Sequence, residues 1–444
     1  MARARKTRRL TVWMNGHAVG VWTLGNRGQH TFGYHDEWLR LPHTRPLSLS
    51  LPLRPAAAPY RSEVVEAFFD NLLPDSREIR QRIQSRFRVA SVQAFDLLAE
   101  IGRDCVGAMQ LLPEGQQPDD WKRITGERLD DAGVAAALRA APVAADNGDD
   151  AFRISLAGAQ EKTALLRHDD AWYRPTGTTP TTHIFKLPLG QIGHGRVDLR
   201  TSVENEWLCT KIVQAYGLAV AECEIATFED QKALVVTRFD RRLAADGRYL
   251  LRLPQEDMCQ ALGVPPTLKY EADGGPGIKA IMDLLLGSTQ AEQDRRTFFK
   301  TQVLFWMLCA MDGHAKNFSI AIKPQGHYRL APLYDLISAW PALGNSPHQW
   351  APQKVKMAMA ARSHNRHYRW AEIQPRHWLS TAQACGVDRA AALNTIHELI
   401  QATPKVVAIV QDKLPAAFPD SVSNPILRGL ETTAGKLADL AEPL

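Results

Sequence analysis

The segment at residues 310–319 combines an acid, a cation and an amide in one short polar stretch. Asp312 and Asn317 are five positions apart, and Lys316 lies next to the asparagine. A carboxylate can orient an acceptor hydroxyl, an amide oxygen can bind Mg²⁺, and a lysine can offset the charge of a transferred phosphoryl group. The most apolar run of the chain comes just before, and its burial would hold the segment rigidly. The spacing therefore predicts a phosphoryl-transfer site with Asp312 as its base.

A second carboxylate, Asp335, lies between apolar residues further along the chain. An acid in such surroundings needs a cation or hydrogen-bond partners. Asn317 and Asp335 together supply the oxygen ligands that Mg²⁺ prefers, so we predict that they form its site. His314 could also be a metal ligand or a base. Because no second histidine or cysteine stands at zinc-ligand spacing, we favour a structural histidine.

Lys186 lies in the apolar run at residues 183–187, where a cation is costly to bury unless it meets an anion. Glu206 follows twenty residues later in a predicted helix. Protein kinases use such a strand lysine and helix glutamate to hold the α/β-phosphates of ATP. A lysine that extends into water and a solvated glutamate remain the alternative.

Residues 153–163 form a turn of small residues, in which backbone N–H groups could approach phosphate oxygens. The string approximates G-x-x-x-x-G-K-T, although Glu161 replaces the second glycine and strand-like residues follow Thr163. An ordinary hairpin turn is the alternative. A P-loop ATPase centred on Lys162 and Thr163, with water as acceptor, is a second enzyme hypothesis.

Three further segments have open interpretations. Residues 238–242 (RFDRR) are either a connection between two lobes or a solvated turn, and residues 273–277 (DGGPG) are either an active-site loop or a surface loop. Residues 351–380 carry a local surplus of five positive charges, from Lys354, Lys356, Arg362, Arg366, Arg369 and Arg376 against Glu372. This last stretch is the best candidate for a DNA-phosphate or acidic-partner surface, and an ordinary basic loop is the alternative.

The rest of the chain must position these groups. Alternating apolar residues around Asn15-Gly16 predict a β-hairpin over residues 10–21. Helical spacing predicts helices at residues 62–73, with Ser62 as N-cap, and at 92–101. An acidic stretch of small residues places a boundary near residue 145. Beyond it we predict strands at 162–166, 183–187 and 233–238 and helices at 203–216, 281–286, 296–311 and 390–414.

Composition defines the class of protein. The chain has 444 residues, of which 45% are hydrophobic and 23% charged, as expected of a folded globular protein. The net charge of +5 is matched by five basic residues at positions 3–9, so the rest of the chain is balanced. Six scattered cysteines without a C-x-x-C pair indicate reduced thiols. No apolar run reaches the ~20 residues that span a bilayer, so we predict a cytoplasmic protein without membrane contact.

Several ordered strings resemble the HipA family of bacterial toxin serine/threonine kinases. They are RPLSLSLPL at 45–53, FFDNLLPDS at 68–76, EIGRD at 100–104, LPQEDMCQ at 253–260, DGHAKN at 312–317 and YD at 334–335. The resemblance runs over nearly the whole chain. It implies an α+β, bilobal protein-kinase-like fold that uses ATP and Mg²⁺. The expected domains are an N-terminal α/β subdomain at residues 1–145 and a kinase core at 146–444 with a mainly helical C-terminal part.

The resemblance also assigns roles to single residues. Asp312 would be the catalytic base with Lys316 beside it, Asn317 and Asp335 the metal ligands, and Ser155 a serine whose autophosphorylation switches the enzyme off. The expected ATP-binding residues are Ala157, Gly158, Ala159, Gln160, Glu161, Lys162, Lys186, Thr237, Arg238, Phe239, His314, Asn317 and Tyr334.

The family's partners give further expectations. They are a HipB-like helix-turn-helix antitoxin and a protein substrate that is an aminoacyl-tRNA synthetase, by resemblance the one for glutamate. DNA would be bound mainly through the antitoxin complex, with residues 362–369 as the candidate direct contact. The non-enzymatic alternative is a catalytically weak, kinase-like corepressor that acts with the antitoxin on operator DNA.

Overall fold

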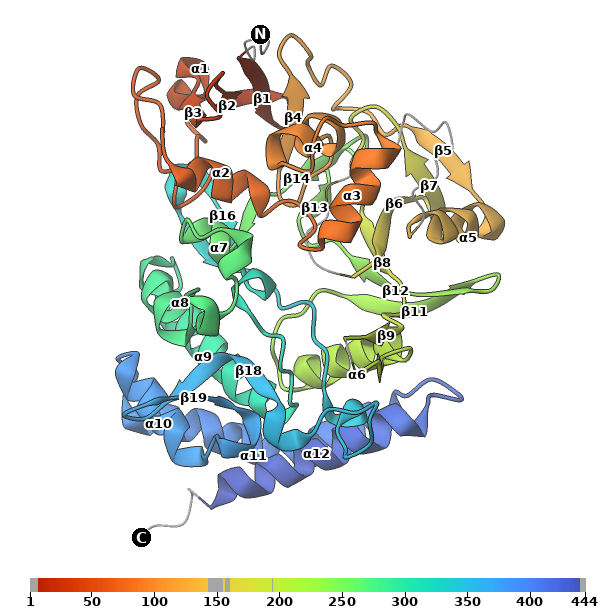
Figure 1. Ribbon diagram of the computed structural model, residues 1–444, viewed down its shortest axis with the longest axis vertical. Coiled ribbons are helices and arrows are strands. Elements are labelled where there is room, and N and C mark those ends of the chain that lie inside the picture. The colour runs from red at the N-terminus through yellow and green to blue at the C-terminus, as the bar shows by residue number, and fades with distance from the viewer. Residues whose placement is uncertain (1–6, 143–154, 156–159, 194, 440–444) are drawn as a thin grey trace. The chain divides into compact units, whose positions relative to one another are not determined.

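The computed structural model describes residues 7–142, 155, 160–193 and 195–439. These residues form two compact units that alternate along the chain (Figure 1). The first unit is made of Met1–Leu187, Ala226–Thr267 and Ile320–Tyr328, and the second of Pro188–Ile225, Leu268–Ser319 and Arg329–Leu444. The boundary predicted near residue 145 lies outside the described residues, so the division into domains there stays a prediction.

The first unit begins with a four-stranded sheet in the order β3-β2-β1-β4. Its strands are β1 (Arg8–Met14), β2 (His17–Leu24), β3 (His30–Tyr34) and β4 (Met109–Pro113). Asn15 and Gly16 join β1 to β2 with φ angles of +45° and +81°, as a type I′ turn requires. The predicted hairpin is therefore confirmed.

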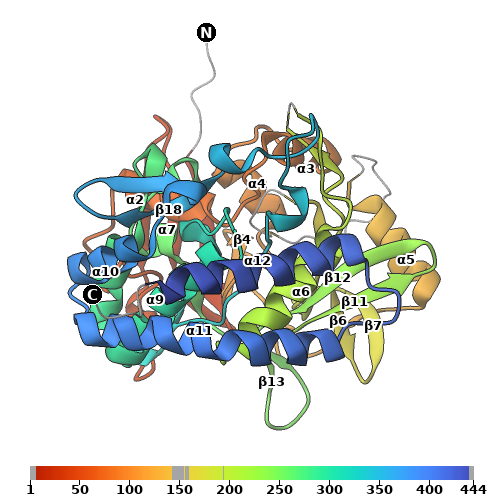
Figure 2. The ribbon, with the colours of Figure 1, turned by 90° about the horizontal axis from the view of Figure 1, so that it is seen from below.

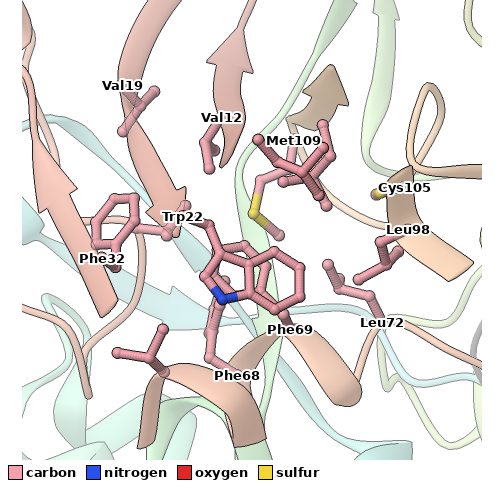
Figure 3. Packing of buried hydrophobic residues seen from close by; sticks show 14 of the residues in the cluster. Val12, Val19, Trp22, Phe32, Phe68, Phe69, Leu72, Leu98, Cys105 and Met109 are labelled. Atoms are coloured by element: carbon pink, nitrogen blue, oxygen red, sulfur yellow. The ribbon is translucent and has the colours of Figure 1, made fainter. Parts of the chain in front are cut away.

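Helices α1 (Asp36–Arg40), α2 (Glu63–Asp70), α3 (Arg77–Arg86) and α4 (Ala94–Ile101) accompany this sheet. Figure 3 shows the shared core, in which Trp22 stacks on Phe69 with ring centroids 4.0 Å apart. The predicted helices at 62–73 and 92–101 are confirmed with shorter bounds. Ser62 stands at the N-cap of α2, but its side chain makes no capping hydrogen bond.

A six-stranded sheet in the order β11-β12-β8-β6-β7-β5 completes most of the first unit. The predicted strands are its centre: β12 (Gln231–Thr237), β8 (His183–Lys186) and β6 (Lys162–His168). The outer strands are β11 (Cys223–Phe228), β7 (Ala171–Pro175) and β5 (Gly126–Leu129). Helix α5 (Asp131–Ala140) packs Leu138 against Leu165 and Phe185 of the sheet.

Shorter elements follow. They are β9 (Gln191–Ile192) with β10 (Val197–Asp198), the hairpin of β13 (Arg241–Leu243) and β14 (Leu250–Arg252), the helix α7 (Met258–Ala261), and a sheet of β15 (Gln255–Asp257), β16 (Ser319–Ile322) and β17 (Tyr328–Leu330). None of these short strands was predicted, because two to four residues carry too little alternation of apolar and polar side chains to be recognised.

The second unit is mainly helical, as predicted. Its helices are α6 (Ser202–Ala215), α8 (Ile278–Leu284), α9 (Ala291–Met307), α10 (Pro375–Ala384), α11 (Arg389–Asp412) and α12 (Asp420–Ala438). Figure 2 shows α11 and α12 running side by side. The hairpin of β18 (Lys356–Arg362) and β19 (Arg366–Arg369) was not predicted. It carries part of the basic stretch identified in the sequence.

All six cysteines are buried thiols that form no disulfide, in agreement with their scattered spacing. Within the described residues, no helix is both long and apolar enough to span a membrane.

Candidate active site

The buried end of helix α9 fixes the polar segment at residues 310–319. The helix buries its side chains from Phe298 to Met307 almost without interruption. Cys309 then takes a left-handed φ of +48°, and the amide of Ala310 donates to the carbonyl of Phe305 at 2.8 Å. This tight turn at the C-terminus of α9 changes the direction of the chain and provides a hydrogen-bond donor for a main-chain carbonyl of the last helical turn. The segment that follows starts from a rigid support, as the sequence predicted.

The main-chain carbonyl oxygen of Asp312 organises this segment. It accepts hydrogen bonds from the amide of His314 at 2.8 Å and from Nδ2 of Asn317 at 2.8 Å. Because the amide nitrogen of Asn317 is used in this way, its Oδ1 is the atom left to accept or to bind a cation. The side chains of His314, Lys316 and Asn317 are buried, whereas Asp312 is exposed. The structure therefore brings the predicted base and metal-binding asparagine together.

The Asp312 carboxylate has a partner that the sequence did not reveal. Oδ1 of Asp312 accepts a hydrogen bond of 2.6 Å from the phenol of Tyr270. The two residues are 42 positions apart, so no local spacing could have linked them. The tyrosine stands just before residues 273–277, which the sequence analysis considered as an active-site loop or a surface loop. Its contact with Asp312 supports the first interpretation.

Tyr334 ties the segment around Asp335 to the same loop. The Tyr334 hydroxyl donates to the carbonyl of Lys316 at 2.9 Å and shares a hydrogen bond of 2.6 Å with Ser319. Asp335 itself is partly buried and adopts a φ of +63°. A non-glycine residue in the left-handed region costs free energy, and such strain concentrates at functional sites. The strained main chain at Asp335 fits the predicted role as a metal ligand.

The donor set suits magnesium better than zinc. No cluster of three His, Cys, Asp or Glu side chains that could hold a metal occurs in the part of the chain that the structure describes. Mg²⁺ is bound by few protein oxygens and completes its shell with water and nucleotide phosphates. The oriented amide oxygen of Asn317 and the carboxylate of Asp335 fit that chemistry.

Two predicted ATP-binding lysines face each other in the first unit. Lys162 of β6 lies directly opposite Lys186 of β8 in the antiparallel ladder, so their side chains point to the same face. Lys186 is only 6% exposed. Like charges placed opposite each other repel, and phosphate oxygens on this face would offset that repulsion. Lys162 also begins a strand, whereas the lysine of a P-loop begins a helix, which counts against the P-loop ATPase.

The end of the predicted phosphate loop is fixed by local contacts. Nε2 of Gln160 donates to the carbonyl of Leu187 at 2.5 Å, and the amide of Leu187 donates to the carbonyl of Glu161 at 3.2 Å. The Glu161 carboxylate forms an ion pair with Arg82 of α3. Ala157, Gly158 and Ala159 lie outside the described residues, so their role stays a prediction.

Ser155 is completely buried. Its hydroxyl donates to the carbonyl of Leu72 at 2.7 Å, and its amide donates to the carbonyl of Asp104 at 3.1 Å. In this conformation the hydroxyl is bonded inside the first unit, so it must leave this position before it can accept a phosphoryl group.

Arg238 belongs to a buried ion cluster. Its guanidinium donates to both oxygens of Asp240, at 3.0 and 2.9 Å, and to Asp104 at 3.2 Å. Arg241 and Arg252 also contact Asp104. The cluster excludes the solvated turn considered for residues 238–242. It also commits the Arg238 side chain, so a nucleotide contact at Thr237, Arg238 and Phe239 would have to use other groups there, and it stays a prediction.

The ion cluster governs the charge of Asp104. Burial alone would raise the pKa of this carboxyl, but Arg241, Arg238 and Arg252 outweigh burial and hold the pKa of Asp104 well below its usual value. The side chain is therefore ionised inside the protein. Its charge is shared by arginines that lie more than 130 positions away in the sequence.

The basic hairpin has an acidic partner outside its own stretch. Arg362 and Arg366 lie 3.9 and 3.7 Å from the buried carboxylate of Glu271, and Arg369 pairs with Glu372 at 2.9 Å. The surplus of five positive charges counted along the sequence is thus smaller in space. Lys186 belongs to the first unit and Glu206 to the second, and their pairing stays a prediction.

Comparisons with known proteins identify the family of the chain. Residues 10–112 match the family model of the HipA N-terminal domain, and residues 154–407 match that of the HipA-like C-terminal domain. The putative kinase Y4mE of Sinorhizobium fredii is 35% identical over 419 residues, which cover 93% of this chain and 94% of that protein. The chain belongs to the HipA family of protein kinases. The predicted family and enzyme class are confirmed.

One more relative supports the assignment to the HipA family, and one solved structure supports the fold. The serine/threonine-protein kinase toxin HipA of Shewanella oneidensis is 30% identical over 311 residues, which cover 66% of each protein. A chain of the S. oneidensis complex of HipA, HipB and operator DNA superimposes with a TM-score of 0.78 at 21% identity, over 98% of this chain and all of that one. The second likeness confirms the predicted α+β kinase-like fold.

The ion cluster gives a first prediction. Asp104→Asn should lower the free energy of unfolding at pH 7 by about 3–5 kcal/mol, because it leaves buried arginines without part of their counter-charge. Urea unfolding of purified protein measures this. The exposed Asp198, paired with Arg200, provides the control Asp198→Asn, which should leave the unfolding midpoint unchanged.

The difference in unfolding free energy between wild type and Asp104→Asn should depend on pH. A carboxyl whose pKa is lowered by folding stabilises the protein above its unfolded pKa of about 4, and this contribution is lost as pH falls further. The stability difference between wild type and Asp104→Asn should therefore shrink below pH 4. A difference that is constant from pH 7 to pH 3 would contradict the ionised state of Asp104.

Proposed function

We propose that this protein is a serine/threonine-kinase toxin of a HipA/HipB-type toxin–antitoxin module. It transfers the γ-phosphate of ATP to a serine of a translation component, by resemblance glutamyl-tRNA synthetase, and thereby arrests growth in the cytoplasm. The observation that carries the proposal is the loop in which Asn317 holds the carbonyl of Asp312, because it presents a carboxylate and an amide oxygen at kinase spacing.

Different residues of the chain have different roles in phosphoryl transfer. Asp312 orients the acceptor hydroxyl and receives its proton, while Lys316 offsets negative charge on the transferred group. Lys162 and Lys186, opposite each other on one face of the sheet, hold phosphate oxygens. Asn317 and Asp335 would bind Mg²⁺, which neutralises charge on the nucleotide phosphates when it is bound.

Burial of Ser155 suggests how autophosphorylation would switch the enzyme off. The unmodified hydroxyl fits a dry site against Leu72. A phosphoserine carries a charge of about −1.5 to −2 at pH 7 and cannot return to such a site without a large desolvation cost. Phosphorylation therefore keeps residue 155 out of its buried position against Leu72.

The partner of the module is a HipB-like antitoxin. The fold is that of a chain found in a complex of HipA, HipB and operator DNA, which supports a similar assembly here. Arg362 and Arg366 share the Glu271 carboxylate, so the hairpin at residues 362–369 has less free positive charge for phosphates than its sequence suggests. DNA is accordingly bound mainly through the antitoxin.

Kinase activity predicts a phosphate on Ser155. Purified wild-type protein incubated with Mg-ATP should gain phosphate on the peptide that carries Ser155, as measured by mass spectrometry. Asp312→Asn should lower the rate by about 10²–10⁴-fold, because it removes the base that orients the hydroxyl. No phosphate on either protein, with folding and ATP binding verified, would favour the corepressor instead.

The placement of Lys162 opposite Lys186 leads to a prediction about ATP affinity. Lys186→Met should weaken ATP binding by about 10–100-fold, since a charge-assisted hydrogen bond contributes roughly 1.5–3 kcal/mol. The exposed Lys232 of the neighbouring strand β12 provides the control Lys232→Met, which should bind ATP as wild type does. Calorimetric titration measures both. A dominant loss in Lys162→Met, with Lys186→Met unaffected and water as acceptor, would restore the P-loop ATPase.

A further inference from the structure

Tyr270 makes the most direct contact with the candidate base. Its hydroxyl donates to Oδ1 of Asp312 over 2.6 Å, which is the length of a charge-assisted O–H···O⁻ hydrogen bond. Both residues belong to the second unit. A carboxylate has two oxygens, so this contact leaves the second oxygen of Asp312 to meet an acceptor hydroxyl.

The main chain around Tyr270 is built to hold the phenol in place. The amide of Gly275 donates to the Tyr270 carbonyl at 3.0 Å, closing a tight turn over the short helix at Glu271–Asp273. A Cβ at Gly275 would lie 1.8 Å from the carbonyl oxygen of Leu268. Only glycine fits this approach, which explains the presence of Gly275 in the string at residues 273–277.

Two further contacts tie Tyr270 to the catalytic loop. The amide of Ala315 donates to the carbonyl of Lys269 at 3.2 Å, and the Tyr270 ring meets the ring of His314 edge to face at 5.0 Å. Together with the hydrogen bond to Asp312, these contacts join the tyrosine to the loop at three places. His314 thus has a structural contact at this place, as the sequence analysis favoured.

Glu271 anchors the turn on its other side. Its carboxylate is 95% buried and accepts the amide of Ala360 in β18 at 2.8 Å. The same strand donates the amide of Ala358 to the carbonyl of Met311, next to Asp312, at 2.9 Å. Strand β18 thus holds both the turn and the catalytic loop, which fixes the distance between the Tyr270 phenol and the Asp312 carboxylate.

We propose that Tyr270 is a positioning residue for phosphoryl transfer, which fixes the Asp312 carboxylate so that its second oxygen meets the acceptor hydroxyl. This inference rests on the proposed kinase function. During transfer the acceptor oxygen bonds to the γ-phosphorus, and the bond from that phosphorus to the β–γ bridging oxygen breaks. ADP leaves with the bridging oxygen, the hydroxyl proton passes to the second oxygen of Asp312, and Tyr270 keeps its own proton.

Asp312 needs such a partner because it is exposed. The terminal torsion of an aspartate is broad, so a solvated carboxylate samples many orientations. A displacement of about 1 Å at a reacting group can cost as much as 10²-fold in rate. A hydrogen bond from a rigidly held phenol removes this freedom before the acceptor arrives.

The test is the conservative variant Tyr270→Phe, which keeps the ring and its packing. We expect kcat for phosphorylation to fall about 10–100-fold while the KM values for ATP and for the acceptor change less than about threefold. The matched control is Tyr216→Phe, since that buried tyrosine makes an equally short hydrogen bond, 2.6 Å to Thr403, in the same unit. It should lower the melting temperature and leave kcat unchanged.

A double-mutant cycle separates positioning from a structural effect. In an Asp312→Asn background, Tyr270→Phe should cause no further loss of the residual single-turnover rate, because Tyr270 acts through the carboxylate. An equal loss in both backgrounds would overturn the inference. So would wild-type kcat in Tyr270→Phe, or a kcat above wild type, which would mean that the phenol blocks the base.

A different experimental result would refute the proposed kinase function itself. If wild-type protein transfers no phosphate to Ser155 or to an added acceptor, the kinase proposal is at fault. If wild type is active and only the Tyr270→Phe result disagrees, the kinase proposal stands and the role of Tyr270 is refuted. Should Tyr270→Phe not fold, Gly275→Ala shifts the same turn by a backbone clash and must then lower kcat in folded protein.

Discussion

The carbonyl oxygen of Asp312 is the point on which the second unit's site depends. It accepts hydrogen bonds from the His314 amide and from the Asn317 side chain, so one atom sets the path of the loop and the orientation of the amide. The loop is in turn held by the buried helix α9, by strand β18 and by the Tyr334 hydroxyl. The side chain of the proposed base, Asp312, can be exposed because these contacts fix the main chain of the loop.

In the first unit the main constraint is different, because several cationic side chains are buried and burial of a charge is costly. Asp104 gathers three arginines at its carboxylate, and its ionised form is stabilised there. Lys162 and Lys186 are set opposite each other where like charges repel. The arginines share the charge of Asp104, and the two lysines share one face of the sheet, where the proposed function assigns them to phosphate oxygens.

Sequence patterns predicted features that are local. The Asn15-Gly16 hairpin, the three central strands of the larger sheet and the buried helix α9 all follow from spacing within a few residues. The association of Asp312 with Asn317 was predicted for the same reason. The resemblance to the HipA family supplied what no spacing shows, namely the family and its expected partners.

Long-range contacts could not be predicted from sequence. Arg238 and Asp104 are 134 positions apart, and the arginine string was interpreted as a lobe connection or a solvated turn. Tyr270 and Asp312 are separated by 42 positions, and Glu271 reduces the charge of a hairpin that begins 85 residues later. Each contact depends on the tertiary path of the chain, which local propensity does not determine.

We propose that the loop from Asp312 to Asn317 presents a metal-binding oxygen to a nucleotide. Titration of ATP into wild-type protein and into Asn317→Ala, each with and without Mg²⁺, tests this role. We expect Mg²⁺ to tighten ATP binding to wild type at least tenfold and this gain to be largely lost in Asn317→Ala, with the same ATP affinity in the absence of metal. An equal gain from Mg²⁺ in both proteins would contradict it.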